Sequence, residues 1–165
     1  MTFSKEQIEK FNDLETPFYY YDLELLKKTL EDLIEESSKR NYKIHYALKA
    51  NSNDRILKLI SGAGLGADCV SGNEIAKAIA TGFIKDEIVF AGVGKSDKEI
   101  KTALENNISC FNVESMQELE VINSIASARN KIASIAIRIN PNIDANTHHY
   151  ITTGLEENKF GINTW

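Results

Sequence analysis

Short apolar runs rich in β-branched and aromatic residues alternate along this chain with longer amphipathic runs, and this alternation constrains the fold more than any other feature. From residue 44 onward the apolar runs recur at intervals of about 20 to 26 residues. A strand-then-helix order predicts parallel strands with helices packed outside them. The apolar runs are nearly continuous, so both faces of the sheet are expected to be buried. Strands are predicted over residues 18–22, 44–48, 66–70, 87–91, 109–113 and 132–139.

Three junctions between predicted strands and helices carry the pattern Ser-x-x-Glu, beginning at Ser71, Ser96 and Ser115. In such a capping box the serine side chain accepts a hydrogen bond from a helix amide, and the glutamate side chain accepts one from the serine amide. Helices are therefore predicted directly after these serines, and they are expected to end at turn residues such as Gly82. The predicted helices cover residues 4–11, 23–39, 53–62, 73–81, 97–105 and 116–128.

Two glycine-rich segments resemble nucleotide-binding loops but are predicted to be ordinary turns. Residues 62–66 follow a predicted helix and precede a strand, whereas the dinucleotide-binding fingerprint needs the opposite order. Residues 92–96 end like a phosphate-binding P-loop, but Val89 stands where that motif requires its first glycine. This second segment is therefore expected to be a strand-to-helix loop in which Ser96 caps the next helix.

Lys49 is the residue of greatest chemical interest. It stands at the carboxyl end of the predicted strand 44–48, where parallel α/β folds place their active sites. A lysine that leaves a buried strand is partly desolvated, which favours its neutral amine, and a neutral amine can form a Schiff base with an aldehyde. The alternative is a lysine whose stem packs at the strand end while its ammonium reaches water.

Several segments together resemble the pyridoxal-phosphate-dependent decarboxylases whose barrel is like that of alanine racemase. Residues 46–51, Tyr-Ala-Leu-Lys-Ala-Asn, resemble the YAxKAN signature of that family, and residues 66–74 and 111–115 resemble its second and fourth strands. The most specific segments are 138–141, 147–154 and 159–162, which resemble the branch that acts on diaminopimelate more than the ornithine and arginine branches. The resemblance extends from residue 16 to residue 162. The pattern alone fits an open doubly wound sheet or a barrel. The resemblance favours an α/β fold that is a partial (β/α)8 TIM barrel, with about five of eight strands present.

The resemblance assigns roles to individual residues. Lys49 is expected to be the catalytic lysine and to hold pyridoxal 5'-phosphate covalently, while Asp68 and Arg138 are expected beside the cofactor on the second and fifth strands. An arginine on an otherwise apolar strand needs a buried partner, so Arg138 also fits a structural ion pair, and Asp68 also fits a helix cap. His148 and Tyr150 lie in a segment that resembles an active-site lid over the substrate, and a solvated loop is the alternative for His148.

The activity implied by the resemblance is decarboxylation of meso-2,6-diaminopimelate to L-lysine, a step of lysine biosynthesis, by a homodimer of the full-length protein. The alternatives are a decarboxylase of ornithine or arginine, a non-catalytic barrel that binds pyridoxal phosphate, and a Schiff-base aldolase without this cofactor. With 165 residues the chain is shorter than the roughly 250 of a complete barrel, so it is expected to be an inactive fragment. Residues 1–22 are expected to form a helix and a strand that pair with a β domain outside the chain, and residues 23–165 the incomplete barrel.

Charge, hydropathy and cysteine content argue against other classes of function. A net charge of −5 gives no electrostatic footprint for nucleic acid or for an anionic membrane surface. No apolar stretch approaches the roughly 20 residues that span a bilayer, and the first residues do not form a signal peptide, so a cytoplasmic enzyme is expected. Cys69 and Cys110 stand in apolar runs and are expected to be buried thiols, and no ligand spacing predicts a metal site.

Overall fold

A computed structural model gives the fold of the chain and describes residues 3–143 and 160–163. Five parallel strands form one sheet in the order β1-β2-β3-β4-β5, so every strand pairs with the next one along the chain. A doubly wound sheet reverses its strand order at a switch point, whereas a barrel wall keeps the sequential order seen here. The fold is therefore a partial α/β barrel, as predicted. The strands are β1 His45–Ala47, β2 Gly66–Cys69, β3 Ile88–Phe90, β4 Cys110–Val113 and β5 Ile135–Ile137.

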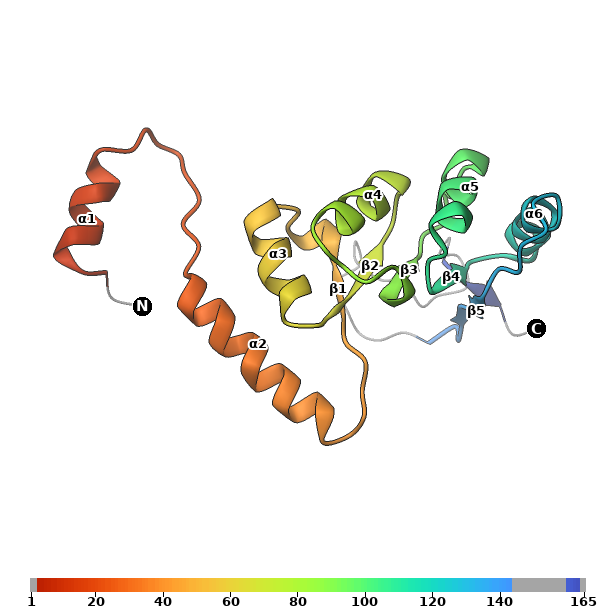
Figure 1. The fold of residues 1–165 in the computed structure, drawn as a ribbon, viewed down its shortest axis with the longest axis horizontal. Helices are drawn as coiled ribbons and strands as arrows, with labels where there is room; N and C mark the ends of the chain where they lie inside the picture. Colours follow the sequence, from red (N-terminus) through yellow and green to blue (C-terminus); the bar gives the residue numbers. More distant parts are fainter. Residues whose placement is uncertain (1–2, 144–159, 164–165) are drawn as a thin grey trace.

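Helices connect each strand of the sheet to the next, and α3 to α6 follow one another along one face of it (Figure 1). Two further helices, α1 and α2, precede the first strand, and α1 lies well apart from the sheet at the left of Figure 1. Helix boundaries agree with the predicted ones to within one residue. The helices are α1 Lys5–Asn12, α2 Leu23–Ser38, α3 Asp54–Gly62, α4 Gly72–Ala80, α5 Asp97–Asn106 and α6 Met116–Ser127, with short 3-10 turns η1 Leu48–Ala50 and η2 Lys85–Glu87.

All three predicted serine caps are confirmed, but only one of them forms the full reciprocal box. Ser96 accepts a hydrogen bond from the amide of Glu99, and the Glu99 side chain accepts one from the amide of Ser96. At the other two caps the glutamate side chain accepts a hydrogen bond from the amide of the residue before the serine, not from the serine amide. Glu74 accepts from the amide of Val70 at 2.7 Å, and Glu118 accepts from the amide of Glu114 at 2.7 Å. These glutamates therefore tie the ends of β2 and β4 to the helices that follow.

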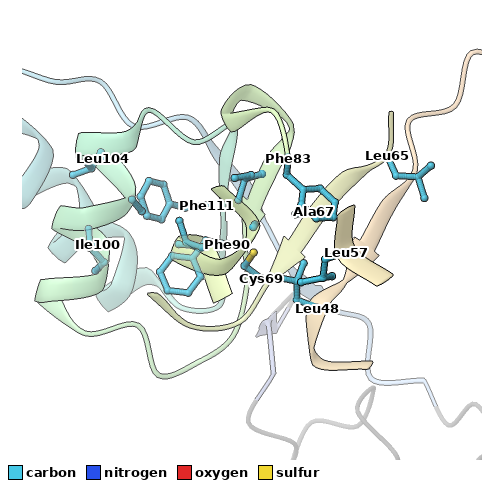
Figure 2. Close-up of a cluster of buried hydrophobic side chains, with 14 of the residues drawn as sticks. Leu48, Leu57, Leu65, Ala67, Cys69, Phe83, Phe90, Ile100, Leu104 and Phe111 are labelled. Atoms are coloured by element: carbon cyan, nitrogen blue, oxygen red, sulfur yellow. The ribbon is translucent and has the colours of Figure 1, made fainter. Parts of the chain in front are cut away.

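The hydrophobic core lies between the sheet and the helices α3 to α6 (Figure 2). Phe90 on β3 and Phe111 on β4 are buried at its centre, with their ring centroids 6.1 Å apart. Leucine and isoleucine side chains from the helices complete it, and each contributes about 1.5–3 kcal/mol by leaving water. Leu48 in η1 is fully buried in the same cluster. Because Leu48 is fixed in the core, the turn that carries the next residue, Lys49, has a defined position.

The predicted strand 132–139 departs from expectation in two respects. All three residues of β5 are exposed, so burial on both faces is wrong for this strand, which has a sheet neighbour on one side alone. The strand also breaks at Arg138 and resumes as β6 Ile139–Asn140, which pairs in parallel with β7 Ile162–Asn163. The amide of Arg138 donates to Val113 at 2.9 Å, and its carbonyl accepts from Ile162 at 2.8 Å. The backbone thus changes partner from β4 to β7 at Arg138, and β7 was not predicted.

The predicted strand 18–22 is wrong for the chain as described, because these residues have no regular secondary structure. They pack instead against α1 through aromatic rings. The ring of Phe11 lies 5.2 to 5.4 Å, between centroids, from the rings of Phe3, Phe18 and Tyr20. Pairing of residues 18–22 with a further β domain stays a prediction.

Candidate active site

A cavity of about 510 Å3 opens at the carboxyl ends of the strands. Residues from or directly after each of the strands β1 to β5 line it, together with Phe160. Its volume lies in the range typical of small-molecule sites, and its place is the one at which α/β barrels carry their active sites.

Three residues predicted for the site line this one cavity: Lys49, Asp68 and Arg138. Ala47 is the register partner of Asp68, which places Lys49 just beyond the end of β1 and beside the second strand. Lys49 lies in η1 and is exposed to solvent. The partial desolvation predicted for this lysine from the sequence is therefore wrong for the structure described. Its amine is accordingly open to a molecule that enters the cavity.

Asp68 has an incomplete hydrogen-bonding environment. Its Oδ1 atom is buried and has no hydrogen-bond partner among the residues that the structure describes. Burial raises the pKa of Asp68, while the positive charges of Lys49 and Arg138 act in the opposite direction. A buried oxygen without a partner is costly, and a bound molecule that supplies a donor would remove that cost.

Arg138 has the buried partner that the sequence required, and this partner is Glu114. The Nη1 atom of Arg138 lies 3.2 and 3.3 Å from the two carboxylate oxygens of Glu114. The Glu114 side chain is only 2% exposed, whereas that of Arg138 is 40% exposed. The ring of Phe160 covers the guanidinium, with its centroid 4.7 Å from Cζ. Sequence reasoning did not assign a role to Glu114. The available signal was its position directly after a buried strand, level with the arginine at the end of the next strand.

Lys95 was also overlooked, since it stands in the segment that resembles a P-loop. Its side chain is 1% exposed and its ammonium is fully engaged. It donates to the carbonyls of Gly92 and Asn112, at 2.7 and 2.8 Å, and to Glu118 Oε1 at 2.5 Å. These bonds confirm that the segment is a strand-to-helix loop rather than a phosphate cradle, with Ser96 as the cap of α5.

Several other predicted features are tested less directly. His148 and Tyr150 lie outside the described residues, so their roles stay predictions. Burial raises the pKa of Cys69 to about 12, which keeps it a protonated thiol. Within residues 3–143 and 160–163, no group of three or more potential ligands could hold a metal ion. No helix in this part of the chain is both long enough and apolar enough to cross a membrane.

Comparison with protein families identifies the chain. The family described as pyridoxal-dependent decarboxylase, pyridoxal binding domain, matches residues 24–165. The chain belongs to the pyridoxal-dependent decarboxylases. The cofactor of this family is pyridoxal phosphate bound to a lysine. The cavity fits such a group, because it offers a lysine amine for the aldehyde, an arginine for anionic oxygens and, at Asp68, a buried oxygen to which none of the residues in the described ranges donates.

Individual members of the pyridoxal-dependent decarboxylases resemble the chain to different degrees. The diaminopimelate decarboxylase of Bacteroides thetaiotaomicron is 58% identical over 156 residues, which are 94% of this chain and 40% of that protein. The crystal structure of the Helicobacter pylori diaminopimelate decarboxylase complexed with L-lysine has a TM-score of 0.88 and 49% identity, covering 95% of this chain and 40% of that one. The Paramecium bursaria Chlorella virus arginine decarboxylase has a TM-score of 0.68 and 27% identity, covering 84% and 35%. The chain thus spans about two fifths of the length of its relatives.

Proposed function

We propose that this chain is the cofactor-binding part of a diaminopimelate decarboxylase, in which Lys49 carries pyridoxal phosphate and the enzyme converts meso-2,6-diaminopimelate to L-lysine. The supporting observation is that Lys49, Asp68 and Arg138 converge on one cavity in a chain 58% identical to a diaminopimelate decarboxylase. Specificity for diaminopimelate rather than arginine is favoured because identity falls from 49% to 27% between the solved enzymes that act on these two substrates.

Each residue of the cavity has a chemical task in this proposal. When bound, the cofactor supplies a ring that accepts the electron pair left by the departing carboxylate. Lys49 would hold the cofactor through Nζ, and its exposed position leaves access for the amino group of a substrate. Asp68 holds a proton or accepts a hydrogen bond at its buried Oδ1. Arg138 directs its remaining N–H groups to anionic oxygens in the cavity.

The remaining parts of the proposal concern the substrate loop, assembly and location. We place His148 and Tyr150 in a loop that contacts the substrate, the enzyme in the cytoplasm, and the complete protein in a homodimer. Support for the substrate loop comes from the resemblance of residues 147–154 to the diaminopimelate branch of the family, and support for the dimer and the location comes from the resemblance of the chain to the family as a whole. Deleting residues 147–154 should lower turnover while pyridoxal phosphate stays bound, and light scattering on the complete protein would report a dimer.

The test uses a protein of the relatives' length that carries this sequence, here termed the long form. It can be built by joining residues 1–165 to the remainder of the Bacteroides thetaiotaomicron relative. The long form should release L-lysine from meso-diaminopimelate and show a visible absorbance that borohydride abolishes. Turnover of ornithine or arginine but not of diaminopimelate would refute the proposed substrate. Absence of the borohydride-sensitive absorbance would refute the proposed cofactor.

A further inference from the structure

Glu114 occupies a position in the site that its role as a simple ion-pair partner does not explain. Its carboxylate is almost fully buried and accepts hydrogen bonds from three parts of the chain. Oε1 accepts from the amide of Gly92 at 3.0 Å, and Oε2 accepts from the amide of Gly161 at 3.1 Å. Both oxygens also face Arg138 Nη1. The side chain therefore joins the loop after β3, the break between β5 and β6, and the turn before β7.

Both backbone donors to Glu114 are glycines in the left-handed region, where side chains are disfavoured. Gly92 has φ +102° and Gly161 has φ +77°. A Cβ atom on Gly161 would lie 3.1 Å from the carbonyl oxygen of Arg138 and 3.0 Å from the amide of Asn140. Both loops thus use a backbone conformation suited to glycine while presenting an N–H to the same carboxylate. This convergence indicates that the carboxylate organises the loops around it.

The main chain of Glu114 is held as firmly as its side chain. Its amide donates to Glu118 Oε2 at 2.7 Å, and Glu118 Oε1 accepts from the buried ammonium of Lys95. Lys95 also donates to the carbonyl of Gly92, the residue whose amide binds Glu114. Lys95 and Glu118 thus fix the backbone on both sides of the Glu114 carboxylate.

Arg138 is fixed through one edge and one face, which leaves its other donors for a ligand. Nη1 is engaged by Glu114, and the ring of Phe160 covers the guanidinium plane. Nε and Nη2 make no hydrogen bond to any residue in the described ranges 3–143 and 160–163. Because Glu114 neutralises its charge, Arg138 offers the cavity oriented donors more than net positive charge.

We propose that Glu114 is a positioning residue, which fixes the orientation of Arg138 at the cavity wall and thereby sets the affinity for the anionic cofactor. The inference rests on the proposed function for the identity of that cofactor. Glu114 acts through Arg138 and does not contact the reacting atoms.

The test is a double-mutant cycle in the long form with Glu114→Gln and Arg138→Lys. In Glu114→Gln one oxygen becomes an NH2 group that cannot accept, so either Gly92 or Gly161 loses its acceptor and the charge opposite Arg138 disappears. Each single variant should weaken pyridoxal phosphate binding, measured by titration of the apoprotein, by about tenfold. The double variant should be no weaker than Arg138→Lys alone, because Glu114 acts through that arginine.

A second readout is independent of the cofactor. In apoprotein, amide hydrogen exchange at Gly92 or Gly161 should accelerate in Glu114→Gln. The matched control is Glu99→Gln, which also removes a carboxylate acceptor of backbone amides, those of Gly72 and Ser96, but lies outside the cavity lining. The control should leave both cofactor affinity and the exchange of Gly92 and Gly161 unchanged.

The outcomes separate the two proposals. If the unchanged long form does not bind pyridoxal phosphate, the proposed function fails, while the exchange measurement still tests Glu114. If it binds and Arg138→Lys weakens binding, but Glu114→Gln does not or the two effects add, the positioning role is refuted. If Glu114→Gln does not fold, Glu114→Asp replaces it in the double-mutant cycle. The aspartate keeps the negative charge but, being one methylene shorter, holds it further from Arg138.

Discussion

The two sides of the cavity differ in how completely their polar groups are partnered. On the side formed by β3, β4 and β5, Glu114 and Lys95 are buried, and both carboxylate oxygens of Glu114 and the ammonium of Lys95 have hydrogen-bond partners. On the side formed by β1 and β2, Lys49 is exposed and Asp68 has a buried oxygen without a partner among the described residues. The partnered side is built by the protein itself. On the side formed by β1 and β2, Lys49 and Asp68 can still interact with a bound molecule. The covalent chemistry is proposed to take place on that side.

Lys49→Ala should have the largest effect on activity, because it removes the amine that is proposed to bind the cofactor on the side of the cavity formed by β1 and β2. In the long form we expect diaminopimelate turnover to fall by about a thousandfold or more. The borohydride-sensitive absorbance should vanish, while the melting temperature of the apoprotein should change little, since Lys49 is exposed. A variant that keeps the reducible absorbance would show that another lysine holds the cofactor.

Lys95→Met should have the largest effect on stability, because it acts on the partnered side. It leaves Glu118 and two carbonyl groups without their buried donor, which should cost about 3–5 kcal/mol of unfolding free energy. Denaturant unfolding of the long form measures this. Lys77→Met is the matched control, since the ion pair of Lys77 with Asp54 is exposed to solvent and should contribute little. Equal losses in both variants would contradict the contrast between buried and exposed pairs.

Gly161→Ala should have an intermediate effect at the edge of the partnered side. The left-handed φ and the close approach to the backbone of Arg138 should cost about 1–3 kcal/mol of unfolding free energy. Gly94→Ala is a suitable control, because a Cβ there would meet nothing within 4 Å. If thermal melting shifts equally in the two variants, the turn before β7 does not depend on glycine.

Asp68→Asn should have the smallest effect, and its sign depends on pH. Because burial raises the pKa of Asp68, the folded state holds the carboxyl proton more tightly than the unfolded state. This stabilisation is fully present below the ordinary aspartate pKa of about 4 and is lost as pH rises through the raised pKa. The variant cannot ionise, so its apoprotein should be more stable than the unchanged apoprotein at neutral pH, by less than about 1 kcal/mol because solvent screens the half-buried carboxylate.

The pH profile of that difference provides the check. The advantage of Asp68→Asn should shrink as pH is lowered toward the ordinary range of an aspartate. Pyridoxal phosphate should bind the variant less well at every pH, since the carboxylate is lost from the cavity. A variant that is less stable than the unchanged apoprotein at neutral pH would show that Oδ1 already has a favourable partner.

Sequence reasoning succeeded where the signal is local. The serine caps and the period of the apolar runs predicted the strands of the sheet and the helices between them, because both are properties of a few consecutive residues. Lys49 could be proposed because it stands at the carboxyl end of a predicted strand, whereas Asp68 and Arg138 were proposed from the family resemblance, and the structure brings all three to one cavity. Whether they act as proposed is a matter for the variants above.

The parts that could not be predicted depend on distant residues. Glu114 forms its contacts with residues 24 and 47 positions away in the sequence, and β7 pairs with a strand that lies more than 20 residues before it. The exposure of β5 follows from its place at the edge of the sheet, which its apolar composition does not reveal. Strand 18–22 was predicted from aromatic content, but aromatic rings also pack against a short helix, as they do here.

The contacts of Glu114 impose an order of assembly during synthesis. The carboxylate leaves the ribosome well before either partner, and its pair with Arg138 closes a loop of 24 residues. The contact with Gly161 closes one of 47 residues, and each doubling of loop length costs about 0.6 kcal/mol more in chain entropy. The pair between Glu114 and Arg138 can therefore form first, and the hydrogen bond from Gly161 to Glu114 forms later, when Gly161 leaves the ribosome. A nascent chain can therefore pair β1 to β5 before Gly161 emerges, so the corner of the cavity around Glu114 is completed after the sheet.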